Sequence, residues 1–91
     1  MPAIQLTPAQ RKLHRAEAHH LDPIVMVGGD GLTPAVKKEC DAALKAHGLI
    51  KVRVFSDDRL ARDEMLRTLS DELGAAPIQH IGKLLVLWRP K

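Results

Sequence analysis

Apolar and polar residues follow two different repeats along this chain of 91 residues. Three short stretches are apolar throughout or alternate, which predicts strands, and three longer stretches repeat apolar residues every three or four positions, which predicts helices. The predicted strands lie at 24–27, 50–55 and, as a hairpin, 78–88, and the predicted helices lie at 8–19, 34–47 and 59–73. This order predicts an α/β fold with a mixed four-stranded sheet, parallel in its early pairs and antiparallel in its final pair.

Capping residues define where the predicted helices begin and end. Thr7 and Gln10 have the spacing of a capping box, with a proline at the first helical position. Thr33 and Pro34 repeat the cap and the proline at the second helix. The remaining boundary residues are Ser56 or Asp57 as the third N-cap, and Gly48 and Gly74 at the ends of the second and third helices.

Two stretches contain no polar residue, and we therefore expect both of their faces to be buried. They are 24–27 and 84–88, of which the second is expected at the centre of the sheet. Gly82 and Lys83, which precede it, suit a type II′ hairpin turn. The second and third helices each have an apolar stripe expected to face inward: Val36, Cys40, Ala43, Leu44 and His47 in one, and Met65, Leu66, Leu69 and Leu73 in the other.

Basic residues gather on one side of the first helix and on one face of the second predicted strand. In the helix, the side with Ala9, Leu13 and Ala16 is apolar, and a separate cationic stripe is expected to be exposed. In the strand, alternation directs three residues away from the core. The cationic stripe comprises Arg11, Lys12, Arg15 and His19, and the outward strand residues are Lys51, Arg53 and Phe55.

Composition and charge describe one ordinary globular domain with a mild basic excess. The chain is 45% hydrophobic and 27% charged, and its net charge is +3. Residues 1–55 hold eight Lys or Arg against five Asp or Glu, residues 56–75 three against six, and residues 76–91 three against none. An acidic segment between basic ones indicates a dipolar surface with one face suited to a polyanion, although a solvated mixed surface has the same composition.

The sequence contains few signals of cellular location or of domain boundaries. The single Cys40 cannot form an internal disulfide, which fits a reducing, cytoplasmic setting. No targeting pattern and no apolar run of membrane-spanning length is found, so we expect no association with a membrane. Residues 1–5 are expected to form a flexible N-terminus before one domain of residues 6–91.

The strongest candidate for a binding site is the glycine-rich loop after the first predicted strand. Gly28, Gly29 and Gly31 allow a tight turn and the close approach of another molecule. The N-cap Thr33 follows, so free N–H groups and the positive end of a helix dipole lie beside the glycines, as they do at phosphate sites. No Lys-Ser or Lys-Thr completes a P-loop, and Pro34 occupies the last glycine position of GxGxxG. Turn geometry alone is the competing explanation.

Four segments in the right order resemble the CRM domain (chloroplast RNA splicing and ribosome maturation), specifically its stand-alone bacterial YhbY-type members. They are the Arg- and His-rich first helix, LDPIVMVGGDGLTPAV, LKAHGLIKVRV and IGKLLVLWRP, which together extend over residues 6–90. The resemblance implies an N-terminal helix before a βαβαββ core similar to the C-terminal domain of translation initiation factor three. It also implies an RNA-binding protein that associates with precursors of the large ribosomal subunit.

The resemblance places the family's GxxG loop at Gly28, Gly29, Asp30 and Gly31, which by analogy with the KH domain would clamp RNA backbone. Asp30 is a departure, because family loops often carry a basic or neutral polar residue between the outer glycines. RNA phosphates and shape are the expected ligand, since the few aromatic residues, Phe55 and Trp88, cannot form a stacking platform alone. The further RNA contacts are expected from Arg11, Lys12, Arg15, Lys37 and Lys38.

We therefore expect a monomeric ribosome assembly factor that binds large-subunit ribosomal RNA, without enzymatic activity, cofactor or metal. No nucleophile and base stand in a persuasive arrangement, and the five His and Cys residues outside the hairpin match no zinc spacing. One alternative is a protein-interaction module that docks on ribosomal proteins through the helix at 59–73. Another is an enzyme acting on a phosphorylated small molecule at the loop. The His and Cys residues are His14, His19, His20, Cys40 and His47.

Overall fold

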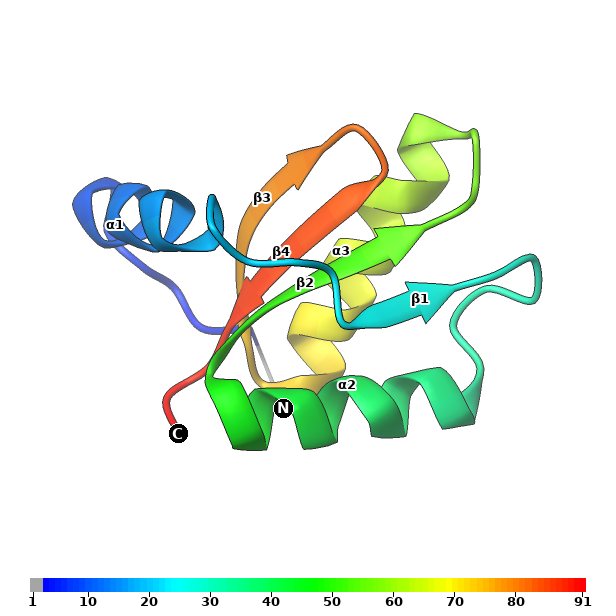
Figure 1. Cartoon of the computed structure of the whole chain (residues 1–91), viewed down its shortest axis with the longest axis horizontal. Coiled ribbons are helices and arrows are strands. Elements are labelled where there is room, and N and C mark those ends of the chain that lie inside the picture. The colour runs from blue at the N-terminus through cyan, green and yellow to red at the C-terminus, as the bar shows by residue number, and fades with distance from the viewer. Residues whose placement is uncertain (1–2) are drawn as a thin grey trace.

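All predicted helices and strands are present in the predicted order in the computed structural model, which describes residues 3–91 (Figure 1). The helices are α1 (Pro8–Ala18), α2 (Pro34–His47) and α3 (Arg59–Leu73), and the strands are β1 (Val25–Val27), β2 (Leu49–Val54), β3 (Ala76–Ile81) and β4 (Leu84–Trp88). Within the expected flexible N-terminus, residues 1 and 2 lie outside the described part of the chain. Ile4 donates a backbone hydrogen bond to the carbonyl of Ala75 (3.0 Å).

The four strands form one mixed sheet in the order β1-β2-β4-β3. β1 runs parallel to β2, and β4 is antiparallel to both β2 and β3. The parallel pair requires a long crossover, which α2 supplies. The β3–β4 hairpin turns at Gly82, whose φ is 56°. No described non-glycine residue has a positive φ, so the next turn residue, Lys83, has a negative one. A type II′ turn requires this combination. The predicted mixed sheet with its closing hairpin is confirmed.

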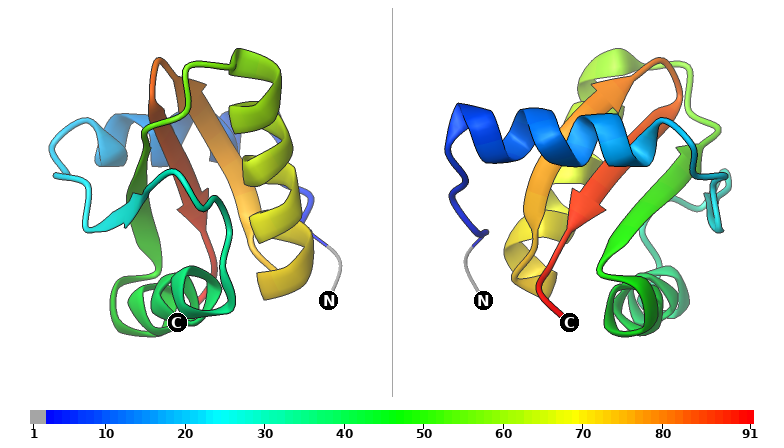
Figure 2. Two further views of the ribbon diagram at one scale, coloured as in Figure 1. Left: turned by 90° about the vertical axis from the view of Figure 1, so that its right-hand side faces the viewer. Right: turned by 60° about the vertical axis from the view of Figure 1, so that its left-hand side comes forward.

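The helices cover the two faces of the sheet unequally. α2 and α3 pack on one face, and α1 crosses the other (Figure 2). The main core lies under α2 and α3, and a smaller cluster around Ala18, Ala76, Ile78 and Val86 lies under α1. β4 is buried on both faces, as predicted from its unbroken apolar run. None of the helices in residues 3–91 has the length and apolar character needed to cross a membrane.

The prediction that residues 24–27 are buried on both faces is wrong. Val25 and Val27 point into the main core and are fully buried, whereas Met26 between them is 51% exposed. β1 is an edge strand, and α1 packs across β2, β4 and β3 rather than over β1. The outer face of β1 therefore stays open to solvent, together with Ile24 before it.

The predicted exposure of the basic stripe on α1 is only partly right. Lys12 and His19 are exposed, but Arg11 and Arg15 are half-buried on the side that includes the buried Ala18. The half-buried His14 shares this side, and its ring stacks on Trp88 at a centroid distance of 4.6 Å. Long basic side chains can cover apolar surface with their stems, which lets such residues face a sheet. In consequence the apolar side of α1 faces outward, and Leu13 is 63% exposed.

Most predicted helix ends are confirmed, with two corrections. The capping box of Thr7 and the Thr33 cap are both formed, and α2 and α3 end at glycines with positive φ. The N-cap of α3 is Asp58 instead of Ser56 or Asp57. Its carboxylate accepts from the N–H of Leu60 (3.0 Å), while Ser56 Oγ accepts from the N–H of Asp58. His47 is exposed instead of inward, because the last turn of α2 borders an open cavity.

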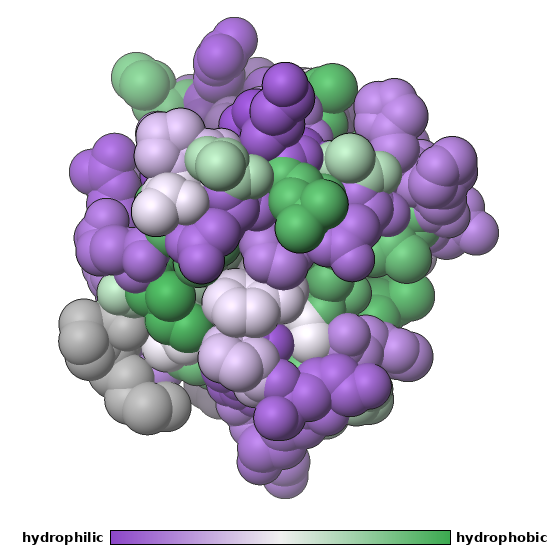
Figure 3. All heavy atoms as spheres, turned by 90° about the vertical axis from the view of Figure 1, so that its left-hand side faces the viewer, coloured by the Kyte–Doolittle hydropathy of each residue, from purple (hydrophilic) through white to green (hydrophobic). Residues whose placement is uncertain are grey.

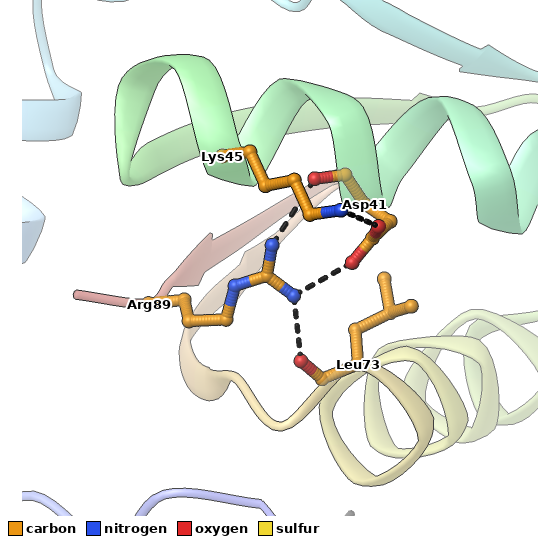
Figure 4. Close-up of polar contacts among 4 residues, drawn as sticks. All are labelled: Asp41, Lys45, Leu73 and Arg89. Carbon is orange, nitrogen blue, oxygen red and sulfur yellow. Dashed lines mark hydrogen bonds and ion pairs between the residues drawn. The ribbon is translucent and has the colours of Figure 1, made fainter. Parts of the chain in front are cut away.

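Arg89 ties the end of β4 to two helices (Figure 4). Its Nη1 donates to Asp41 Oδ1 on α2 and to the carbonyl of Leu73 at the end of α3, both at 2.8 Å. Its Nη2 donates to the carbonyl of Asp41 (3.1 Å), and Lys45 Nζ lies 3.3 Å from Asp41 Oδ2. The hydrogen bond from Arg89 is the main cause that lowers the pKa of Asp41. The Arg89 side chain is only 14% exposed, so water has little access to compete for these hydrogen bonds.

Arg89→Met should lower the free energy of unfolding by about 2 kcal/mol, because it removes hydrogen bonds from a charged, mostly buried donor. The midpoint of urea unfolding measures this change. Arg67→Met is the matched control, since Arg67 is exposed and its only described ion pair is the 3.8 Å contact with Asp63 on the same helix. The control should change stability by less than about 0.5 kcal/mol. Equal losses in both variants would contradict a structural role for Arg89.

Candidate functional site

The glycine-rich loop joins the end of β1 to the start of α2 and turns sharply. The N–H of Gly31 donates to the carbonyl of Gly28 (3.1 Å), and the N–H of Thr33 donates to the carbonyl of Gly31 (3.0 Å). Gly31 has a φ of 70°, which favours glycine strongly. Turn geometry therefore explains one of the three glycines.

Gly28 and Gly29 are not explained by backbone conformation or by packing. Neither has a positive φ, and a Cβ atom placed on either would meet no atom within 4 Å. Both are exposed, and in the part of the chain that the structure describes the N–H of Gly29 donates to no backbone carbonyl. The fold therefore leaves open space and a free donor here, which are the requirements for a bound anion to approach the backbone closely.

The start of α2 adds a helix end and two lysines to the loop. Thr33 Oγ accepts from the N–H of Val36 (3.2 Å), which fixes the first turn next to the glycines. Lys38 is exposed and forms no ion pair among residues 3–91. Lys37 Nζ instead lies 3.0 Å from Glu72 Oε2 on α3. Of the two lysines, Lys38 is the freer to bind a ligand.

The basic residues of α1 do not join the loop. Figure 1 shows α1 and the β1–α2 loop at opposite sides of the molecule. The predicted set of site residues is thus divided in two: Gly28, Gly29, Asp30 and Gly31 with Lys37 and Lys38 at one side, and Arg11, Lys12 and Arg15 at the other.

A sheet surface beside the loop was not recognised as part of a site from the sequence. Met26 on β1 lies opposite Arg53 on β2, and the guanidinium carbon of Arg53 lies 5.4 Å from the centre of the Phe55 ring. The N–H of Phe55 donates to the carbonyl of Val27 (3.0 Å), so Phe55 lies next to the first glycine. Strand alternation places these side chains outward. They stay uncovered because they lie beside the edge strand β1, which α1 does not cover.

Charge is distributed unevenly between the two sides of the sheet. The exposed carboxylates of α3 lie on the side covered by helices: Asp63, Glu64, Asp71 and Glu72. The uncovered part of the opposite face carries Lys51 and Arg53, neither of which forms an ion pair among the described residues. The unpaired basic side chains of the open sheet face therefore favour the approach of a polyanion to that face.

The other potentially reactive side chains lie in surroundings that suit a structural role rather than a chemical one. Burial, assisted by Glu39, raises the pKa of the Cys40 thiol to about 11, so the reactive thiolate is scarce at neutral pH. Within residues 3–91, no three His, Cys, Asp or Glu side chains are grouped so that they could hold a metal ion. An open cavity of ≈ 600 Å³ borders Glu17, His20 and His47, and lies at the end of β1 away from the glycines.

These features describe a small α/β domain with an exposed glycine-rich loop at the start of a helix. The chain belongs to the CRS1/YhbY (CRM) domain family, whose model matches residues 6–89. A Haemophilus influenzae protein named RNA-binding protein is 44% identical, over 93% of this chain and 86% of its own. A Pseudomonas aeruginosa protein named probable RNA-binding protein is 36% identical, over 92% and 81%. A solution structure of a hypothetical Staphylococcus aureus protein, described as a candidate RNA-binding protein, has a TM-score of 0.87 at 32% identity, covering 96% of this chain and 91% of that one.

Substituting the loop glycines one at a time should separate their roles. Gly31→Ala should lower the free energy of unfolding by about 1 kcal/mol or more, because alanine is strained at a positive φ. Gly29→Ala should leave stability almost unchanged, because its Cβ would enter open space. Thermal unfolding of the two variants makes the comparison. A large loss in Gly29→Ala would mean that the turn itself requires this glycine.

Proposed function

We propose that this chain is an RNA-binding protein whose loop, Gly28 to Gly31, clamps the RNA backbone. The observation that carries the proposal is that Gly28 and Gly29 face open space beside a helix start, where neither φ nor packing requires glycine. A phosphate could approach the loop closely, accept hydrogen bonds from its free N–H groups and gain from the positive end of α2. The names of the relatives support RNA as the source of that phosphate.

The finer proposal is that the RNA is large-subunit ribosomal RNA or its precursor, and that the protein acts in ribosome assembly in the cytoplasm. Its support is the resemblance to the stand-alone bacterial members of the family. Lys38, with a smaller contribution from Lys37, would contact phosphates next to the loop. Because α1 lies at the other side of the molecule, its basic residues would contact a separate segment of the same RNA: Arg11, Lys12 and Arg15.

The surface around α1 favours RNA over a protein partner and fits a monomer. Figure 3 faces the side of the molecule on which α1 lies, and hydrophobic residues occur there as separate patches among hydrophilic ones. Protein-binding surfaces are more often continuous apolar patches. The outward Leu13 is one such isolated residue.

Gly29→Asp should weaken binding to fragments of large-subunit ribosomal RNA by about tenfold or more, because it removes hydrogen bonds to a charged phosphate and adds repulsion. Fluorescence anisotropy at near-physiological salt measures the affinity, with DNA of matching sequence as the competitor. Ala42→Asp is the control, since it adds the same charge at an exposed position of α2 away from the loop. Equal losses in the two variants, or equal competition by DNA, would contradict an RNA clamp at the loop.

Lys38→Ala should reduce the slope of log affinity against log salt by about 0.7, because one phosphate contact on a single strand is lost. Lys37→Ala should reduce it less, because Glu72 already neutralises this lysine. Titrations at several salt concentrations give both slopes. An unchanged slope in Lys38→Ala would assign this residue to the solvated surface.

A further inference from the structure

One row of side chains crosses the end of the sheet nearest the loop. Met26 lies opposite Arg53, Arg53 lies opposite Leu84, and Leu84 lies opposite Ile81. These pairs follow the strand order β1-β2-β4-β3, so the row spans all four strands. It lies on the same face as α1, but the cluster under α1 contains Val86 and Trp88, further along β4. Met26 and Ile81 consequently stay exposed.

Phe55 extends this row toward the glycines. Phe55 is 49% exposed and its ring lies close to the Arg53 guanidinium, while its backbone is hydrogen-bonded to Val27. The ring belongs to neither buried cluster. An exposed aromatic ring beside a guanidinium offers a flat apolar surface and a cation together.

The charge of this sheet surface indicates which kind of ligand it can bind. Arg53 and Lys51 form no ion pair among the described residues, and the two carboxylates that follow Phe55 in the chain after Ser56 are engaged elsewhere. Asp57 pairs with Lys83 at 2.8 Å, and Asp58 caps α3. An unpaired nucleotide combines a flat base with a negative phosphate and thus matches both properties.

We propose that Phe55 and Arg53, with Met26 beside them, form a subsite for one unpaired base of the bound RNA. This inference rests on the proposed function: the loop holds a phosphate, and the base of an adjacent nucleotide stacks on Phe55. The RNA is therefore single-stranded where it crosses from the loop to the sheet. A single ring accommodates a single base, so the subsite agrees with the scarcity of aromatic residues in the chain.

The test combines Phe55→Ala with removal of single bases from a short single-stranded RNA. On the intact RNA, Phe55→Ala should weaken binding by about tenfold, within the range measured for base–aromatic stacks. When the base at one particular position is removed, wild type and variant should bind equally. Phe55→Trp should restore binding. Leu13→Ala, at another exposed apolar position on the outer side of α1, should bind as wild type.

The outcomes separate this subsite from the proposed function. If Gly29→Asp weakens binding and Phe55→Ala does not, the loop binds RNA and the subsite is wrong. If Phe55→Ala weakens binding equally for every abasic RNA, Phe55 contacts no base. If the wild-type protein binds no RNA, both proposals fail. If wild type sediments as a dimer and Phe55→Ala as a monomer, the surface belongs to a second copy of this chain.

Discussion

Burial of both faces of β4 is the constraint on which the rest of this structure depends. Leu85 and Leu87 face the core under α2 and α3, while Val86 faces the cluster under α1. A strand that is apolar on both faces needs cover on both, which explains three layers in so short a chain. α1 has only 11 residues and packs across β2, β4 and β3, leaving β1 uncovered. The outer face of β1 and the adjoining end of β2 stay open as a consequence, and they border the glycine loop.

Local sequence signals predicted the elements well, because caps, glycines and apolar repeats act over a few residues. They could not distinguish residues 24–27 from 84–88, since both runs are apolar throughout. The difference is that β1 lies at the edge of the sheet and β4 at its centre, and strand order is not a local property. Similarly, the side of α1 that faces the sheet includes His14, whose ring stacks on Trp88, a residue distant in sequence.

The candidate site was predictable to the extent that it is local. The glycines and the Thr33 cap are neighbours in sequence, and they form the expected loop. The grouping of basic residues was not predictable, because it depends on where α1 lies and on the pairing of Lys37 with Glu72. The position of Phe55 beside Val27 likewise follows from the parallel register of β1 and β2.

The position of β4 also has a consequence for how the domain is made. β4 is the last strand of the domain in sequence, yet it joins β2 to β3, and Arg89 just after it holds α2 and α3. During synthesis, β1 can pair with β2, but β3 has no neighbouring strand until β4, at the end of the domain, has left the ribosome. Folding is therefore concentrated in one late, cooperative step rather than proceeding gradually from the N-terminus.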